Sequence, residues 1–265
     1  MTTHGILNPN AGRGNFSLER VAPSEDLAHL VERHWMVTWD LRGGEPFAQE
    51  TLPHPCVNFV IGTHRAGVHG VGSARFVAEL AGRGWVLGTK FRPGGFHALY
   101  GRDVSELSER EVSIASVFGE AGVALEAEVL AREGGVVCVP LLERFFRERL
   151  PARRDENIDL AARAVDIARA DPSIGRTSDL AAHVSRSARS LERLFQRYVG
   201  VPPKWIIRRY RIHEACERVA SGAAPSWSSL AQQLGYFDQS HFIRDFKSQV
   251  GRTPAEYAEL CGRSL

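Results

Sequence analysis

The chain has 265 residues, of which 43% are hydrophobic and 24% are charged. This composition is typical of a globular protein with a buried core, and the length suits one large domain or two small ones. No apolar run approaches the ~20 residues that a membrane span requires. The N-terminus lacks the basic and apolar blocks of a signal peptide, so we expect a cytoplasmic protein with no membrane contact.

Charge is divided unevenly along the chain. The net charge is +2, but residues 151–265 contain 18 basic and 13 acidic residues, against 15 and 18 in residues 1–150. A basic C-terminal half beside an acidic N-terminal half predicts that the second half binds any polyanionic partner.

The first hundred residues are predicted to be β-rich. Runs of β-branched and aromatic residues over 34–41, 56–62 and 84–91 are separated by turn signals containing Gly and Pro. This pattern favours a small barrel or sandwich. Ser24 is a candidate N-cap for a short helix over 24–34, before the first of these strands.

Helical spacing replaces this pattern after Asp103. Apolar residues recur at helical intervals up to Leu150, and the charged segment 151–157 then follows a proline. We predict an α+β fold in three parts: a β-rich domain over 1–102, a helical linker region over 103–156 and an all-α domain over 157–262.

The last part contains an internal repeat. LAAHV (180–184) matches LAQQL (230–234), and LERLF (191–195) matches FIRDF (242–246). The offset grows from fifty to fifty-one residues, so the second copy has one extra residue in its turn. Each copy reads as a short helix, a turn and a longer helix, which is the helix-turn-helix plan for DNA binding.

The longer helix of the first copy is predicted over 187–198, with Ser187 as its N-cap. Its apolar residues form one buried stripe, and its arginines form a second stripe suited to a phosphate-lined groove or to guanine. A solvated arginine face is the alternative explanation of a single such stripe. The candidate DNA contacts here are Arg186, Ser187, Arg189, Ser190, Arg193 and Arg197.

The second copy repeats this design with different polar residues. Its longer helix, over 238–250, places Arg244 at the position of Arg193, which a solvated surface explains poorly. A long helix starting near Pro203 would hold the two helices about one DNA turn apart, on the order of 34 Å. The candidate contacts here are Gln239, Ser240, His241, Arg244 and Lys247. Because the two sets differ, we expect them to read different base sequences.

These segments resemble a known family. Residues 157–257, with LAAHVSRSARSLERLFQRYVG and LAQQLGYFDQSHFIRDFKSQVGRTPAEY, are similar to the DNA-binding domain of AraC/XylS transcription regulators. The resemblance implies groove contacts by Arg189, Ser190 and Arg193 in the first helix, and by residues 239–241 and Arg244 in the second. The chain departs from the family at Ser185, where glycine is usual, and at Arg186, where a small apolar residue is usual.

The N-terminal segments LPHPCVNF (52–59) and KFRPGGFH (90–97) resemble a domain found on actinobacterial members of that family. Such domains are cupin-like barrels that sense a ligand or mediate dimerisation. Candidate effector contacts are Trp35, Trp85 and Arg92, although aromatic core packing and a tight turn at 91–95 are the alternatives.

Nothing in the sequence indicates a metal site, a cofactor or a catalytic centre. The four cysteines form no CxxC pair, and His54, His64, His69 and His97 lack the spacing of a metal-binding cupin. We therefore expect a non-enzymatic, sequence-specific transcription regulator controlled by a small molecule or by dimerisation. Its expected partners are double-stranded DNA, an effector, RNA polymerase and a second copy of the chain.

Two alternatives remain open. One is a DNA-repair enzyme that transfers alkyl groups to cysteine, for which Cys56 is the candidate although it lacks the Pro-Cys-His context. The other is an architectural DNA-binding protein that takes no ligand.

Overall fold

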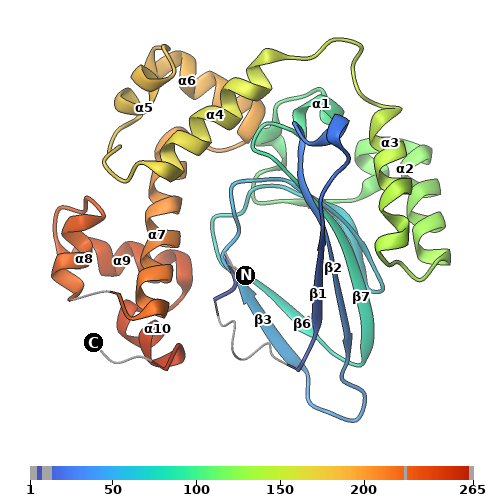
Figure 1. Ribbon diagram of the computed structural model, residues 1–265, viewed down its shortest axis with the longest axis horizontal. Coiled ribbons are helices and arrows are strands. Elements are labelled where there is room, and N and C mark those ends of the chain that lie inside the picture. Colours follow the sequence, from blue (N-terminus) through green and yellow to red (C-terminus); the bar gives the residue numbers. More distant parts are fainter. Residues whose placement is uncertain (1–4, 8–13, 224–225, 263–265) are drawn as a thin grey trace.

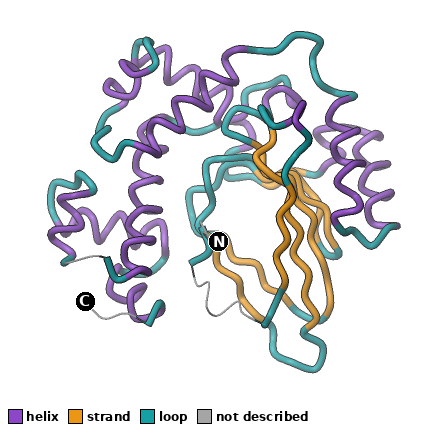
Figure 2. The backbone as a smooth tube through the Cα atoms, in the orientation of Figure 1, coloured by secondary structure: helices purple, strands orange, loops and turns teal. Residues whose placement is uncertain are grey.

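The computed structural model describes residues 5–7, 14–223 and 226–262 (Figures 1 and 2). It has the predicted α+β class, with a β-rich N-terminal part followed by helices. The strands within the described residues are β1 (Ser17–Val21), β2 (Val31–Asp40), β3 (Phe47–Thr51), β4 (Asn58–Gly62), β5 (Arg65–His69), β6 (Phe76–Leu80), β7 (Arg83–Phe91) and β8 (Glu111–Val112).

The strands form two antiparallel sheets. A six-stranded sheet has the order β1-β2-β7-β4-β5-β8, and β3 pairs with β6 in a separate two-stranded sheet. The three strands predicted from the sequence correspond to β2, β4 and β7, which are neighbours in the large sheet. Their β-branched and aromatic residues suit a pleated, largely buried surface, so this part of the prediction is confirmed.

Two helices cover one face of the large sheet, on the right in Figure 1. These are α2 (Ile114–Ala131) and α3 (Val139–Arg147). Phe59 of β4 contacts Phe118 of α2 edge-to-face, with ring centroids 6.1 Å apart, and Phe146 of α3 at 5.5 Å. The helices predicted after Asp103 therefore form one side of the N-terminal core.

The helix predicted over 24–34 is wrong. Only a single 3-10 turn forms, over Glu25–Leu27, and β2 already begins at Val31. Ser24 does not cap this turn with its side chain, because its hydroxyl donates to Glu143 of α3 and its backbone N–H donates to Glu143 Oε1 at 2.7 Å. Glu143 also lies 3.4 Å from His34 Nε2, and these long-range contacts override the local preference.

The C-terminal part consists of helices and lies on the left of Figure 1. Near the C-terminal end of β7 there is also the short α1 (His97–Tyr100). The C-terminal helices are α4 (Glu156–Ala170), α5 (Thr177–His183), α6 (Ala188–Leu194), α7 (Pro203–Ser221), α8 (Trp227–Gln233), α9 (Gln239–Val250) and α10 (Pro254–Leu260). No helix among the described residues has the length and apolar character needed to cross a membrane.

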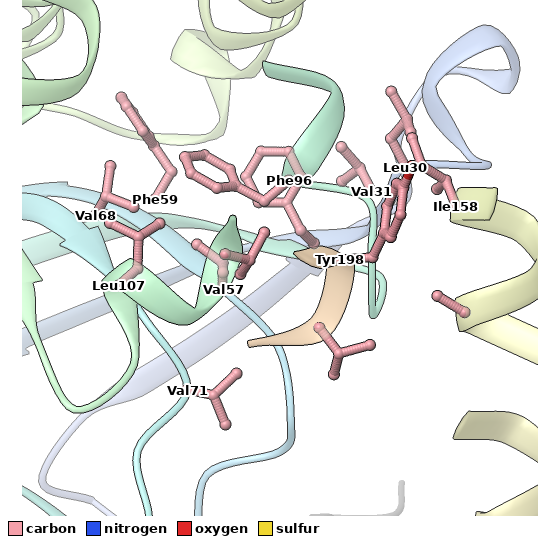
Figure 3. Close-up of a cluster of buried hydrophobic side chains, with 14 of the residues drawn as sticks. Leu30, Val31, Val57, Phe59, Val68, Val71, Phe96, Leu107, Ile158 and Tyr198 are labelled. Atoms are coloured by element: carbon pink, nitrogen blue, oxygen red, sulfur yellow. The ribbon is translucent and has the colours of Figure 1, made fainter. Parts of the chain in front are cut away.

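One hydrophobic cluster joins the sheet domain to the first C-terminal helices. Figure 3 shows Phe59 and Leu107 together with Ile158 of α4 and with Tyr198. The cluster continues along the chain as far as Ile207 in α7. It therefore crosses the charged segment 151–157, where the sequence suggested a boundary.

A second cluster holds the last helices. It includes Ile212 and Val219 of α7, Phe242 and Phe246 of α9, and Leu52, which follows β3. The first half of α7 thus belongs to one core and its second half to the other, which makes α7 the link between them.

Polar contacts also fasten the sheet domain to the helices. Ser108 donates its hydroxyl to the carbonyl of Gly200 at 2.6 Å. Arg209 of α7 is fully buried and donates to the carbonyl of Gly72 at 3.1 Å. Glu50 of β3 accepts from Arg252, which lies between α9 and α10. The sheet domain therefore contacts both halves of the helical part.

Candidate nucleic-acid interface

The first candidate unit consists of α5, a four-residue turn over 184–187, and α6. Ser187 is the N-cap of α6, and its hydroxyl accepts from the N–H of Ser190 at 3.2 Å. Beyond Leu194 the chain continues as a π-turn over Phe195–Val199 and ends at Gly200, where φ is +96°. Leu191 and Phe195 are fully buried, so the predicted apolar stripe faces the core.

The opposite side of this unit is exposed and basic. All six residues that the sequence selected are exposed: Arg186, Ser187, Arg189, Ser190, Arg193 and Arg197. They line one hollow of about 560 Å³, which also includes Asp103 and Asn157. Among the described residues, no carboxylate forms an ion pair with Arg186, Arg189 or Arg193. A group of exposed arginines without acidic partners suits an anionic ligand.

The second unit consists of α8, a five-residue turn over 234–238, and α9. Asp238 is the N-cap of α9, and its carboxylate accepts from the N–H of His241 at 2.7 Å. Phe242, Phe246 and Val250 are fully buried. The predicted contacts Gln239, Ser240, His241, Arg244 and Lys247 are all exposed. The turn is one residue longer than in the first unit, as predicted.

The two turns share one backbone feature. Ser185 has φ +52° and Gly235 has φ +71°, so both lie in the left-handed region at the same place in the motif. Glycine adopts this conformation without steric cost, whereas a residue with a Cβ is strained by roughly 1–2 kcal/mol. The shorter turn of the first unit thus keeps this left-handed position although serine replaces glycine.

A buried carboxylate that the sequence analysis did not select positions the second unit. Asp245 of α9 is 4% exposed and accepts from the hydroxyl of Tyr236 at 2.7 Å and from Arg208 of α7 at 2.5 Å. Burial alone would raise the pKa of Asp245, but the hydrogen bonds from Arg208 and Tyr236 lower it. The sequence feature that points to this role is an acidic residue between Phe242 and Phe246, next to the buried stripe.

The effector candidates are not brought together. Trp35 pairs with Gly88 across β2 and β7, and its indole packs on that glycine, whose added Cβ would lie 2.2 Å from the ring. Trp85 pairs with Thr38, three residues from Trp35, so the two indoles lie on opposite faces of the sheet. Trp85 lines an open hollow of about 870 Å³ beside β2, with Met36 among its neighbours.

Arg92 is exposed, and its Nε donates to the carbonyl of Ala28 at 2.7 Å. The turn after β7 is closed by a hydrogen bond from the N–H of Gly95 to the carbonyl of Arg92 at 2.8 Å. This arrangement is a tight turn that is fastened to the segment before β2.

The histidines and cysteines that the structure describes are not clustered as metal ligands. Among the described residues, no group of three or more His, Cys, Asp or Glu side chains is arranged to hold a metal ion. Cys56 is 5% exposed, and burial raises the pKa of its thiol to about 11. Burial therefore favours the protonated thiol of Cys56 over the thiolate, which is the nucleophilic form.

Two family models match parts of the chain. Residues 19–113 match a domain of unknown function (DUF6597), and residues 180–259 match a helix-turn-helix domain that begins at Leu180 and spans both units. The C-terminal part is an AraC-type helix-turn-helix domain. The match covers both repeated segments, whose resemblance to an AraC-type domain was noted from the sequence.

Several solved structures are similar to the chain, whereas no curated protein matches it. A transcriptional regulator with an AraC-type DNA-binding domain from Chromobacterium violaceum is 25% identical over 39% of this chain and 92% of its own, with a TM-score of 0.37. A probable AraC family transcriptional regulator from Rhodopseudomonas palustris CGA009 is 24% identical over 39% and 97%, with a TM-score of 0.36. ToxT from Vibrio cholerae O395 is 13% identical over 94% and 99%, with a TM-score of 0.39.

Proposed function

We propose that this protein is a sequence-specific DNA-binding transcription regulator in which α6 and α9 enter successive major grooves. One observation carries the proposal: two repeated units each bury an apolar stripe and expose the polar and basic residues of a capped helix. The 19-residue α7 joins them and is about 28 Å long at 1.5 Å per residue, somewhat shorter than one turn of DNA at roughly 34 Å.

Phosphate contacts would supply most of the affinity, and base contacts would supply the specificity. Arg193 and Arg244 occupy equivalent positions, and either side chain can donate two hydrogen bonds to a guanine. The remaining residues differ between α6 and α9, so the site for one chain is asymmetric.

The N-terminal domain is proposed to control this binding, through a small molecule or through dimerisation. The contacts that support control are those of the sheet domain with both units: the shared cluster, the Ser108–Gly200 hydrogen bond and the Glu50–Arg252 ion pair. A change in the sheet domain can therefore alter how the two units lie relative to each other.

The test begins with an operator selected from random DNA by the full-length protein. Arg193→Ala and Arg244→Ala are each expected to weaken operator binding by about 5- to 150-fold, the equivalent of one base contact, with a smaller effect on random DNA. Arg144→Ala is the control, because this exposed arginine lies on α3, across the sheet from the AraC-type domain.

Equal losses on operator and random DNA would refute base readout by these arginines. Thermal-shift screening against metabolites tests control by an effector. A ligand that binds the sheet domain and changes operator affinity supports it, and ligand-independent operator binding by a monomer contradicts both routes of control.

A further inference from the structure

One side chain at the second unit stands out by its exposure. Phe237 is 94% exposed, whereas Val137, the next most exposed large apolar side chain among the described residues, is 67% exposed. A phenylalanine ring in water forgoes the free energy that its burial would contribute. Contact surfaces on proteins commonly combine exposed apolar groups with a polar rim. Phe237 lies beside such polar residues, because residues 238–241 are all exposed.

The position of Phe237 follows from the extra residue in the second turn. Both turns have a left-handed residue near their start and an N-cap at their end: Ser185 and Ser187 in the first unit, Gly235 and Asp238 in the second. One residue lies between these two points in the first turn and two lie between them in the second. The second turn therefore has room for an inward and an outward side chain.

Tyr236 takes the inward position. It is 8% exposed, its hydroxyl donates to Asp245 at 2.7 Å, and its ring contacts that of Phe242 edge-to-face at 5.4 Å. With Tyr236 held in the core, Phe237 is left on the outer side. In the first turn the single residue between the two points, Arg186, is exposed.

The neighbours of Phe237 are the proposed DNA contacts of the second unit. It directly precedes the N-cap Asp238, and Gln239, Ser240 and His241 follow as the exposed first turn of α9. We propose that Phe237 is a specificity-determining residue that contacts the 5-methyl group of a thymine in the major groove read by α9. Phenylalanine is one of the side chains that make apolar contact with this methyl group.

This inference rests on the proposed function and adds one element to it. The second unit would combine hydrogen-bonding side chains on α9 with an apolar contact from the turn, whereas the first unit has an arginine in its turn. The longer turn would then present one more side chain to the DNA without disturbing the cap or the core of α9.

The experiment measures binding of the full-length protein to its selected operator. Thymines in the half read by α9 are replaced one at a time by deoxyuridine, which lacks only the 5-methyl group. For the unmodified protein we expect about a fourfold loss at one thymine, the equivalent of one buried methyl group. Phe237→Ala is expected to bind the normal operator about tenfold more weakly and to be insensitive to deoxyuridine at that position.

Two variants control this measurement. Phe237→Leu keeps an apolar side chain and should retain most of the affinity and the sensitivity to deoxyuridine. Val137→Ala removes another exposed apolar side chain, far along the chain from the AraC-type domain, and should bind like the unmodified protein. Because Phe237 contributes no charge, the slope of affinity against salt concentration should not change in Phe237→Ala.

Normal operator binding by Phe237→Ala, with normal sensitivity to deoxyuridine, would overturn the inference. If that variant also lost transcription with purified polymerase, Phe237 would belong to a protein contact instead. A change in its sedimentation alone would assign it to contact with a second copy. The proposed function fails separately, if the unmodified protein selects no operator or if Arg193→Ala and Arg244→Ala bind it normally.

Discussion

Asp245 offers the sharpest test of how the second unit is held together. In Asp245→Ala the hydroxyl of Tyr236 stays buried without its acceptor, which costs about 1–3 kcal/mol. The lost contact with Arg208 adds about 1 kcal/mol or less, since that side chain is 49% exposed and water can solvate it. We expect the free energy of unfolding to fall by about 1–4 kcal/mol, measured by urea denaturation.

A double-mutant cycle isolates the Tyr236 contribution. Tyr236→Phe removes the hydroxyl that Asp245→Ala leaves without an acceptor. Asp245→Ala should therefore lower the free energy of unfolding less in the Tyr236→Phe background than in the unmodified protein. A cost below about 0.5 kcal/mol in the unmodified protein, or an equal cost in both backgrounds, would refute this account of the contact.

The pH dependence of the same variant has a definite sign. The folded pKa of Asp245 is lowered, so its contribution to stability is present above the unfolded pKa of about 3.9 and is lost as pH falls through the lower folded pKa. The difference in stability between the unmodified protein and Asp245→Ala should therefore narrow in acid. A difference that widened below about pH 4 would contradict the assigned direction of the shift.

Two further predictions concern the first turn and the thiols. Ser185→Gly should raise the free energy of unfolding by about 0.5–1 kcal/mol, because relief of the left-handed strain exceeds the entropy cost of glycine. Gly235→Ser should lower the free energy of unfolding by a similar amount. Melting temperatures equal to that of the unmodified protein would contradict this. Cys56 should resist a thiol reagent at neutral pH until the protein unfolds, while the partly exposed Cys261 reacts in the native state. Rapid labelling of Cys56 in the native protein, or its alkylation by methylated DNA, would support the repair-enzyme alternative.

The parts of the fold that depend on local sequence were predictable. The repeated apolar spacing located α6 and α9, and Ser187 was recognised as a cap because a hydroxyl before an apolar period satisfies a free backbone N–H. The extra residue of the second turn followed from the change in offset. The apolar spacing and the cap involve residues within a few positions of one another, and the offset follows from comparing two copies of one pattern, so the sequence alone contains the information.

Two of the features that were missed, the contacts of Ser24 and of Asp245, depend on residues far apart in the chain. Ser24 looked like a helix cap, but Glu143, 119 residues later, engages both its hydroxyl and its N–H. The π-turn over 195–199 replaced the end of a regular helix, and nothing in the periodicity signals it. The role of Asp245 required knowing that Tyr236 and Arg208 converge on it, which only the folded arrangement reveals.

The division of α7 between two cores bears on how such regulators can be recombined. Ile207 belongs to the cluster shared with the sheet domain, and Ile212, little more than one turn later, belongs to the other cluster. A hybrid joined at the charged segment 151–157 would place helices from another protein in the middle of the first cluster, where their side chains would not match those of the sheet domain. A hybrid joined within α7, between Ile207 and Ile212, would exchange the second helix-turn-helix unit while leaving that cluster intact. Because α6 packs in the cluster shared with the sheet domain, the first unit should be exchanged only together with that domain.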